Sequence, residues 1–522
     1  MLIGDLARLN AIRYGSKPAF SDEKRTISFD RAHHRMNALI RMLYDFGLEK
    51  GDRVAVLLHN CAIYCELLYG IPRGGFIMVP INYRLAGREL TYILNDSQSC
   101  VLIYGEEYAE SVEAIRPHLD SVRHFIRVGD ENQSPFQDHS YEKIVAAEGP
   151  DTSPDDITES DVAFILYTSG TTGFPKGAML THKNIFTNIC NAALVRGVKP
   201  SDKLFDIPPL YHCGAQTEMF VWSMYGCETY SLKKFEPLAV LEALKTERPN
   251  IVMMVPTMLN MVVNHPKIGD YDLSFVELMI YGGSSIMRAH LQRAMEVFGC
   301  KFLQTAGMTE ASPCLMFLLP EDHVVEGPGH LVKRLGSAGR EAPLTEIRIV
   351  DEQGSECKAG IPGEAIARGD NIMKGYWNKP DETARTIRDG WLHSGDICVR
   401  DEDGYIYYVD RIKDMICRGG ENVYPREVEE VIAGHHQVLE VAVIGVPDPR
   451  LQEEIMAVVG LKECAVVSAR DIVDICHNKL ARFKHPRYVA FVDHLPKTSS
   501  GKILKRELKE RYARESLPPK VS

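Results

Sequence analysis

YTSGTTGFPKGAML, at residues 167–180, is the stretch that decides the fold. An apolar run, DVAFILY at 161–167, leads into it, and a helical pattern begins near His182. Most residues at 168–177 are Gly, Ser or Thr, and Lys176 is the only cation among them. Glycine lets backbone N–H groups approach an anion, while hydroxyl groups and a lysine add donors. This composition predicts a loop that binds phosphate oxygens at the end of a buried strand.

Two other interpretations of this loop remain open on its residues alone. A Walker A loop needs a lysine followed by Ser or Thr, but here Pro175 precedes Lys176 and Gly177 follows it. Lys176 is therefore not expected at the mouth of a helix. A flexible surface loop has a similar composition, because Gly, Ser and Thr are common in linkers.

Length and composition limit the class of protein. The chain has 522 residues, which is too long for one compact core, so at least two domains are expected. A net charge of −11 argues against a nucleic-acid surface. The 13 cysteines lack metal-like pairs, no apolar run is long enough to span a membrane, and the N-terminus lacks a signal-peptide core. These features predict a cytoplasmic protein with reduced thiols.

The order of predicted elements indicates parallel sheets. Short apolar strands alternate with amphipathic helices over residues 51–118 and again over 250–307, a pattern typical of a parallel sheet covered by helices. From about Gly336, short strands with tight turns replace this pattern, and a smaller α+β unit begins after Arg411. The polar stretch 129–161 is interpreted as a surface connection.

The predicted fold class is therefore α/β. A large N-terminal domain, residues 1–410, is expected to combine two parallel α/β sheet subdomains with a small distorted β subdomain at about 336–410. A small α+β C-terminal domain, residues 411–522, is expected to follow.

Further motifs follow the loop in order: PPLYHCGA at 208–215, YGGSS at 281–285, QTAGMTEA at 304–311 and WLHSGDI at 391–397. Together with the loop, they resemble the signatures of the adenylate-forming (ANL) superfamily, which includes the AMP-forming acyl-CoA synthetases. The resemblance covers nearly the whole chain. It implies an AMP-dependent synthetase and ligase with a mobile C-terminal domain.

The resemblance implies a nucleotide site. The loop would hold the β- and γ-phosphates of ATP through Thr168, Ser169, Gly170, Thr171, Thr172, Gly173 and Lys176. Adenosine would lie against Gly283, Ser284, Thr305, Ala306, Gly307 and Met308. Asp396 would bind both ribose hydroxyls, and Arg411 would reach ribose or phosphate. The sequence departs from the family at Ala306, where an aromatic residue usually stacks on adenine, and at Ser394, where Thr is more frequent.

The same resemblance implies the catalytic groups. Thr309 and Glu310 match the pair that contacts phosphate and Mg²⁺, with Glu310 as the metal ligand. His212 would lie between the carboxylate and the acyl pocket, and the acid would also contact Gly282, Gly283 and Met308. Lys502, in the C-terminal domain, would bridge the carboxylate and the α-phosphate during adenylation.

The resemblance also implies a thiolation step that depends on domain rotation. Lys413 matches the family hinge. The glycine-bearing loop with Gly419 and Gly420 would line the tunnel for the pantetheine arm. Phe483 and Arg487, in ARFKHPR at 481–487, are candidates to stack on the adenine and pair with the phosphates of CoA; a solvated loop is an equally good interpretation of that stretch.

The predicted function is ATP-dependent acid–CoA ligation through an acyl adenylate, with release of pyrophosphate and AMP. The segments expected around the acid, 212–222, 281–285 and 306–317, are apolar and lack Lys or Arg, which favours fatty or aromatic monocarboxylic acids. The expected partners are the acid, ATP and CoA, with a homodimer left open. The alternatives are a ligase that loads a carrier protein, a luciferase-type oxygenase and a non-catalytic nucleotide-binding regulator.

Overall fold

The computed structural model describes residues 1–129, 138–147, 149–151, 153–168, 174–284, 286–412, 414–419, 421–477, 479–497, 503–514 and 517–521. The chain divides into two compact units. The first comprises Met1–Ile347 and Ala367–Leu392, and the second comprises Arg348–Ile366 and His393–Ser522.

The first unit contains a sheet with strand order β19-β9-β8-β4-β3-β5-β6-β7. Its strands are β3 (Arg53–Leu57), β4 (Ile77–Pro80), β5 (Val101–Gly105), β6 (His124–Val128), β7 (His139–Ser140), β8 (Val162–Thr168), β9 (Lys176–Thr181) and β19 (Gly375–Tyr376). The strands from β8 through β7 pair in parallel, whereas β9 is antiparallel to β8 and β19 is antiparallel to β9. The accompanying helices are α1 (Ile3–Tyr14), α2 (Phe29–Asp45), α3 (Ala62–Arg73), α4 (Gly87–Asp96), α5 (Ala109–Ile115) and α6 (Tyr141–Val145), with short 3₁₀ turns η1 (Glu106–Tyr108) and η2 (Arg116–His118).

A second sheet of the same unit has the order β16-β15-β14-β13-β12-β10-β11-β1-β2. Its strands are β1 (Pro18–Ser21), β2 (Thr26–Ser28), β10 (Lys203–Asp206), β11 (Glu228–Ser231), β12 (Ile251–Met254), β13 (Leu278–Gly282), β14 (Lys301–Gly307), β15 (Cys314–Leu318) and β16 (Arg340–Glu341). The strands from β1 to β14 along this order are parallel. The helices are α7 (His182–Arg196), α8 (Cys213–Met224), α9 (Pro237–Glu247), α10 (Pro256–Val263), α11 (Arg288–Phe298), α12 (Gly329–Lys333) and α13 (Pro380–Thr386), and the 3₁₀ turns are η3 (Ile268–Asp270), η4 (Thr309–Ala311), η5 (Pro320–Asp322) and η6 (Arg334–Gly336).

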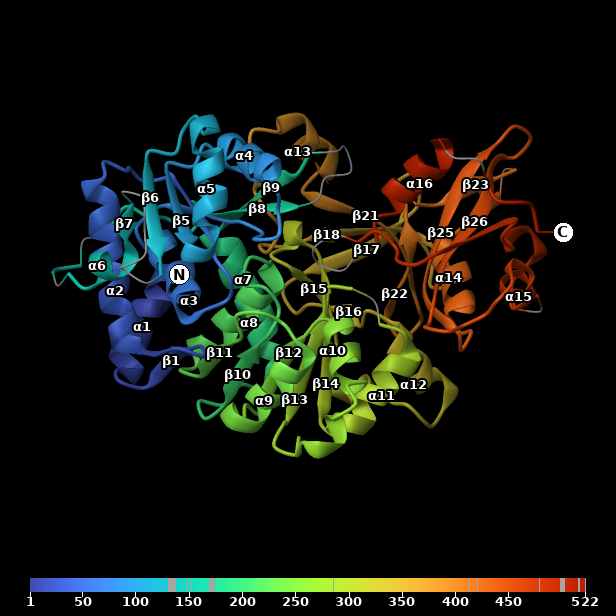
Figure 1. Ribbon diagram of the computed structural model, residues 1–522, viewed down its shortest axis with the longest axis horizontal. Coiled ribbons are helices and arrows are strands. Elements are labelled where there is room, and N and C mark those ends of the chain that lie inside the picture. Colours follow the sequence, from blue (N-terminus) through green and yellow to red (C-terminus); the bar gives the residue numbers. More distant parts are fainter. Residues whose placement is uncertain are drawn as a thin grey trace. The chain divides into compact units, whose positions relative to one another are not determined.

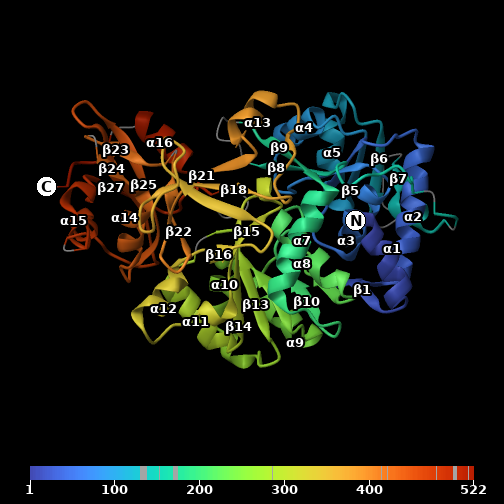
Figure 2. The same cartoon turned by 180° about the vertical axis from the view of Figure 1, so that it is seen from behind.

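One hydrophobic core joins these two sheets. It takes apolar side chains from β3, β8, β10 and β12 and from helices α2, α3, α7 and α8. Figures 1 and 2 both show α7 and α8 between strands β8 and β9 of the first sheet and β10 of the second. Burial on this scale is the main stabilising contribution to a domain, at roughly 25 cal/mol per Å² of apolar surface. The two sheets therefore form one folded body rather than separate domains.

The local sequence explains how the loop at 167–180 is framed. The apolar run before it forms β8, and the chain after it returns as β9, with Thr168 opposite Lys176. The expectation that Lys176 does not stand at a helix mouth is confirmed, because it begins a strand. Helix α7 starts after Thr181, whose Oγ1 accepts a hydrogen bond from Asn184 N at 3.2 Å, and it ends at Gly197 with φ +62°.

Two further sheets lie mostly in the second unit. One sheet has the order β17-β18-β21-β20, with β22 beside β21, and another has the order β24-β23-β26-β25, with β27 beside β26. The strands of these two sheets are β17 (Glu346–Val350), β18 (Gly363–Arg368), β20 (Ile387–Arg388), β21 (Trp391–Arg400), β22 (Ile406–Arg411), β23 (Ile416–Arg418), β24 (Glu421–Val423), β25 (Val438–Asp448), β26 (Gln452–Leu461) and β27 (Tyr488–Val492). Of these, β20, the first two residues of β17 and of β21, and the last two residues of β18 fall within the residues of the first unit. The helices are α14 (Pro425–Ala433), α15 (Ala469–Asp474) and α16 (Lys505–Arg514), with the 3₁₀ turn η7 (Arg482–Lys484).

The predicted fold class is confirmed, but one sequence interpretation was wrong. The stretch 129–161 is more than a surface connection, because it contains α6, whose first residue Tyr141 is fully buried. Tyr141 Oη donates to Glu66 Oε1 at 2.6 Å, and Glu66 pairs with Arg35 in the same buried cluster. Among the described residues, no helix is both long and apolar enough to cross a membrane.

Candidate active site

The carboxyl ends of the parallel strands of the second sheet bring one group of the predicted site residues to one edge. His212 lies beyond the end of β10, Gly282 ends β13, and Thr305, Ala306 and Gly307 end β14. Open α/β sheets bind ligands at this edge, at the point where the strand order reverses. Here the reversal lies at β10, because β11 flanks it on one side and β12 on the other.

Two glycines at this edge are required by close packing. Gly282 pairs with Thr305, and a Cβ at Gly282 would come within 2.2 Å of the Thr305 carbonyl oxygen. A Cβ at Gly307 would come within 1.9 Å of the Pro313 carbonyl oxygen. Gly283 follows with φ +82°, in a region that side chains rarely adopt. These positions keep the backbone edge thin, so that a ligand can approach it.

His212 is placed by the start of α8. It is the residue before the helix, half-buried, and its backbone N–H donates to Pro209 O at 3.0 Å. The next residue, Cys213, donates from Sγ to Thr309 Oγ1 at 3.6 Å. This contact puts the histidine segment beside the Thr309–Glu310 segment, as the sequence motifs predict for parts of one site.

Asn60 is a residue of this region that the sequence interpretation missed. It follows β3 of the first sheet, is 4% exposed, and holds the loop that leads to His212. Its Nδ2 donates to Pro208 O at 2.8 Å, and its Oδ1 accepts from Leu210 N at 2.8 Å. The only signal in the sequence is an Asn three residues after a buried strand, which by itself indicates a turn.

Glu310 has a partner that the sequence interpretation also missed. Tyr376 Oη donates to Glu310 Oε1 at 2.8 Å, and both side chains are buried. Burial and the Glu310 charge raise the pKa of Tyr376, so its hydroxyl remains a donor. Within the described residues, no second hydrogen bond to this carboxylate is present, which leaves Oε2 for a cation. A hard carboxylate oxygen is the ligand type that Mg²⁺ prefers.

The residues on either side of the predicted phosphate loop are described by the structure. Thr168 Oγ1 lies 3.5 Å from Lys176 O, and Lys176 Nζ lies 5.4 Å from the centre of the Tyr376 ring. Figures 1 and 2 show α13, which follows Tyr376, beside β8 and β9. The loop residues Ser169, Gly170, Thr171, Thr172 and Gly173 lie outside the described residues.

Ala306 and the residues that follow it pack within the first unit. Ala306 pairs with Met316 across β14 and β15 and is 9% exposed. Met308 is half-buried, and its N–H donates to Pro313 O at 3.0 Å. Ser284 is half-buried beyond Gly283.

In the second unit, Asp396 and Arg411 form an ion pair. They are opposite each other on β21 and β22, with Arg411 Nε 3.0 Å from Asp396 Oδ1. Ser394 Oγ donates to Ala365 O at 2.6 Å and accepts from Asp396 N at 3.1 Å, which holds the backbone of β21 beside Asp396. The two residues predicted to bind ribose therefore lie side by side.

The remaining predicted positions of the second unit are partly described. Gly419 has φ +61°, and its N–H donates to Leu451 O at 2.8 Å. Phe483 packs against the hydrophobic core of this unit, whereas Arg487 is exposed. Lys413, Gly420 and Lys502 lie outside the described residues.

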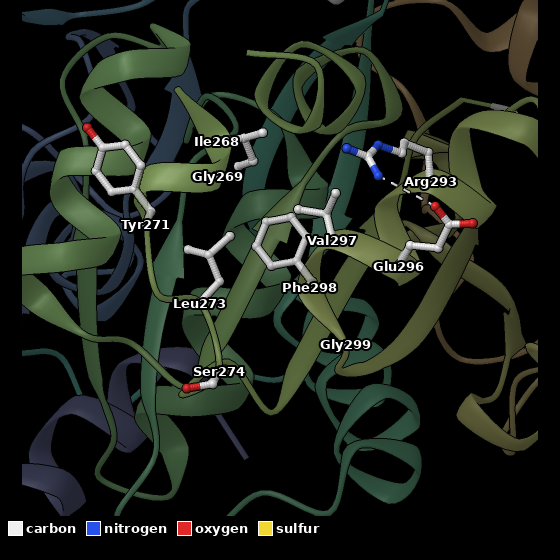
Figure 3. A pocket seen from close by; sticks show the side chains of 10 residues that line it. All are labelled: Ile268, Gly269, Tyr271, Leu273, Ser274, Arg293, Glu296, Val297, Phe298 and Gly299. Atoms are coloured by element: carbon white, nitrogen blue, oxygen red, sulfur yellow. Dashed lines mark ion pairs between the residues drawn. The ribbon is translucent and has the colours of Figure 1, made fainter. Parts of the chain in front are cut away.

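A pocket of 340 Å³ lies elsewhere in the first unit (Figure 3). It is lined by residues of 268–274 and by the end of α11, including Phe298 and the Arg293–Glu296 ion pair at 3.5 Å. These segments precede β13 and β14, so the pocket is at the amino ends of the strands. None of the predicted site residues lines it, and ligands of such sheets bind at the opposite edge.

Comparisons with known proteins give the family. The model described as "AMP-binding enzyme" matches residues 8–377, and the model described as "AMP-binding enzyme C-terminal domain" matches residues 427–502. A feruloyl-CoA synthase of Amycolatopsis sp. is 36% identical over 487 residues, covering 93% of this chain and 94% of that protein. The long-chain-fatty-acid–CoA ligase FadD13 of Mycobacterium tuberculosis is 36% identical over 483 residues, covering 92% of each.

The solved structures agree with these relatives. The anthranilate CoA ligase AuaEII in complex with anthranoyl-AMP aligns with a TM-score of 0.88 and 27% identity, covering 98% of this chain and 97% of that one. A fatty acyl CoA synthetase of Mycobacterium tuberculosis aligns with a TM-score of 0.77 and 33% identity, covering 98% of each. The chain therefore belongs to the AMP-binding enzyme family, as an acid–CoA ligase of the adenylate-forming superfamily.

Proposed function

We propose that this protein joins a fatty or aromatic monocarboxylic acid to CoA in two steps. The acid first attacks the α-phosphate of ATP, which forms an acyl adenylate and releases pyrophosphate. The thiol of CoA then attacks the acyl carbon and displaces AMP. The observation that supports this most strongly is the convergence of His212, Gly282, Thr305 and Glu310 at one sheet edge, framed by Tyr376 and Lys176. AMP-binding enzymes use ATP and CoA.

The first step needs positive charge at the α-phosphate. Negative charge develops there as pyrophosphate leaves, so cationic groups aimed at it lower the barrier. Lys176 and the loop hydroxyls would hold the outer phosphates, and Lys502 would bridge the carboxylate and the α-phosphate. Glu310 Oε2 and Thr309 would hold Mg²⁺, which when bound supplies charge neutralisation on the phosphates.

The nucleoside and the acid would be fixed by separate groups. Asp396 would accept hydrogen bonds from both ribose hydroxyls while Arg411 orients its carboxylate. His212 would border the acid carboxylate, and Gly282 and Gly283 would present bare backbone to the acyl group. Without an aromatic residue at Ala306, adenine would be held by the backbone of 305–308 rather than by a ring.

The expected lining and the relatives support this substrate class. Cys213, Met219 and Trp222 of α8 are buried apolar residues. The relatives named above are a feruloyl-CoA synthase, a long-chain-fatty-acid ligase and an anthranilate ligase, and each of these names refers to a monocarboxylic acid. One cation, Arg196, is buried near this region, but its guanidinium is paired with Glu218. This cation is therefore not available to a second substrate carboxylate.

A second candidate is loading of a carrier protein. A fatty acid–[acyl-carrier-protein] ligase, ScoC of Streptomyces coeruleorubidus, is 34% identical over 503 residues. Both candidates share the adenylation step and differ in the thiol that follows.

The test is a pyrophosphate-release screen with ATP, Mg²⁺ and acids of graded chain length and ring content. The best acid is then incubated with CoA or with a phosphopantetheinylated carrier protein, and the thioester is identified by mass. Acyl-CoA as the product supports the proposal, and acyl carrier as the sole product supports the second candidate. No pyrophosphate release with any acid would contradict both.

A further inference from the structure

The segment around Tyr376 connects the phosphate loop to the metal-binding carboxylate. On one side, Tyr376 pairs with Ala178 of β9, and Trp377 N donates to Gly177 O at 2.8 Å. On the other side, Met373 N donates to Glu310 O at 2.8 Å. Backbone hydrogen bonds thus tie residues 373–377 both to the strand that begins at Lys176 and to the Glu310 turn.

The Tyr376 side chain makes the same connection. Its hydroxyl donates to Glu310 Oε1 at 2.8 Å, and Lys176 Nζ lies 5.4 Å from the centre of its ring. A lysine at this distance from an aromatic face is attracted by the negative charge on the face of the ring. One buried side chain therefore touches both groups that the proposed function places on the phosphates and the metal.

The position of Tyr376 is itself fixed. Its N–H donates to Thr383 Oγ1 at 2.8 Å, and Thr383 Oγ1 in turn donates to Lys379 O at 2.9 Å in α13. Tyr376 is 8% exposed and Glu310 is 7% exposed. A carboxylate held by a buried hydroxyl has one preferred orientation, and the same orientation presents Oε2 away from the tyrosine.

We propose that Tyr376 is a positioning residue for the reaction: it orients the Glu310 carboxylate for Mg²⁺ and holds Lys176 over the phosphates. Outer partners of metal-binding carboxylates set ligand orientation, and their loss typically lowers metal affinity about 10- to 100-fold. The inference rests on the proposed function for the roles of Glu310 and Lys176. It adds that the metal and phosphate groups are coupled through one ring.

The test compares Y376F with the wild type. The substitution removes the hydroxyl and leaves the ring beneath Lys176, so orientation of Glu310 is lost while the lysine contact remains. We expect the Mg²⁺ concentration that gives half-maximal pyrophosphate release to rise about 10-fold, with little change in the KM for the acid. As a readout independent of turnover, calorimetry measures ATP binding with Mg²⁺ and with EDTA, and the Mg²⁺-dependent gain in affinity should shrink by a similar factor.

A matched control is Y141F. Tyr141 Oη also donates to a buried glutamate, Glu66, at 2.6 Å, but in the cluster between α2, α3 and α6. Y141F should lower the melting temperature by a comparable amount and leave the Mg²⁺ dependence at the wild-type value. A role of Tyr376 that is merely structural would make the two variants behave alike.

Two further variants sharpen the result. In the E310Q background, Y376F should add no further shift in the Mg²⁺ requirement, because residues that act through one contact are not additive. If Y376F does not fold, T383V replaces it. This variant removes Thr383 Oγ1, the acceptor for Tyr376 N, but leaves the hydroxyl group of Tyr376 in place. It should shift the Mg²⁺ requirement in the same direction.

The inference is overturned if folded Y376F has the wild-type Mg²⁺ requirement and the wild-type gain in ATP affinity. An additive effect in the E310Q background would also overturn it. A wild-type protein that binds Mg²⁺ and ATP but activates no acid would contradict the proposed function instead, and the binding measurements would still decide the role of Tyr376.

Discussion

Asp206, at the end of strand β10, is a buried residue that lowers the stability of the folded protein. It closes β10, is fully buried, and neither carboxylate oxygen has a hydrogen-bond partner among the described residues. Burial, and then the charge of Glu218, raise the pKa of Asp206 well above its usual value. The folded protein therefore keeps a proton there that the unfolded chain releases at neutral pH.

The first prediction is that D206N stabilises the protein at neutral pH. Because the folded pKa is raised, the folded state binds more protons than the unfolded state above about pH 4, and stability falls as pH rises, by up to about 1.4 kcal/mol per pH unit. Asparagine cannot ionise, so this loss disappears. The measurement is the melting temperature of the wild type and of D206N between pH 5 and pH 8. The difference in favour of D206N is expected to grow as pH rises.

The control for this prediction is D202N. Asp202 is also buried, near the start of the same strand, but its carboxylate accepts hydrogen bonds from Asn250 Nδ2 and Lys199 N. D202N should therefore destabilise the protein. A D206N gain that does not grow with pH would mean that Asp206 is ionised in the folded state.

At the scale of elements, helix α7 links distant parts of the first unit through one polar face. Asn184, Asn188 and Asn191 are spaced so that they lie on one side of the helix, and all are buried. Asn184 Nδ2 donates to the carbonyls of Asp370 and Ile372, and Asn188 Oδ1 accepts from Cys314 N at 3.1 Å. The helix thereby fixes the segment that precedes Tyr376 and the strand that follows Glu310.

The loop after β10 is also held by hydrogen bonds from a side-chain amide to the backbone. The amide is that of Asn60, at the edge of the first sheet. Asn60 satisfies backbone groups of Pro208 and Leu210, which would otherwise be buried without partners, at a penalty of about 1–3 kcal/mol each. Because His212 follows directly, the first sheet sets the position of a residue that belongs to the second.

The second prediction is that N60A raises the KM for the acid about 10-fold, while the KM for ATP stays near the wild-type value, because a small displacement of a positioned group weakens binding at that group alone. N60D should show the same defect above the pKa of the introduced carboxyl group. It should recover in part at lower pH, where the protonated carboxyl group can again donate to Pro208 O. Steady-state kinetics over a pH range measure both effects.

Asn10 provides the control. It is 1% exposed, and its Nδ2 donates to Ser223 O at 2.8 Å, near the end of α8 that is distant from His212. N10A should lower the melting temperature much as N60A does and leave the KM for the acid unchanged. Equal kinetic defects in both variants would show a general loss of stability rather than displacement of His212.

For the whole molecule, the predicted groups are divided between the two units. His212, Glu310 and Lys176 belong to the first unit, whereas Asp396, Arg411 and Gly419 belong to the second. The two proposed half-reactions would need different groups, a cation at the α-phosphate in the first and a thiol at the acyl carbon in the second. We propose that a change in the arrangement of the C-terminal part, about the hinge Lys413, separates them.

The third prediction is that K502A abolishes adenylation and spares thiolation. The lysine is proposed to stabilise charge that develops only in the first step, so its loss should lower acid-dependent pyrophosphate release by roughly 10²- to 10³-fold. Formation of acyl-CoA from supplied acyl adenylate should continue near the wild-type rate. Equal losses in both half-reactions would contradict this assignment.

The fourth prediction concerns the hinge and expects the opposite result, impaired thiolation with adenylation retained. K413P restricts φ at the residue that is proposed to absorb the rotation, so thiolation of supplied acyl adenylate should slow strongly while adenylation is retained. Pyrophosphate release measures adenylation, and formation of acyl-CoA from supplied acyl adenylate measures thiolation. Unchanged thiolation would exclude Lys413 as the hinge.

Much of the fold was predictable because it depends on local pattern. The alternation of buried strands and amphipathic helices predicted parallel sheets, and the capping residue Thr181 and Gly197 mark the ends of α7 where the pattern changes. The polar stretch 129–161 was misjudged because Tyr141 is buried through contacts with Glu66, 75 residues earlier in the chain.

The sequence by itself determined the family motifs, the order of strands and helices, and the residues that can carry charge, because these depend on neighbours along the chain and on side-chain chemistry. Only the tertiary structure decided that Tyr376 meets Glu310 across 66 residues and that Asn60 meets Pro208 across 148. The physical reason is that such hydrogen bonds form only after packed sheets have brought distant backbone segments within about 3 Å.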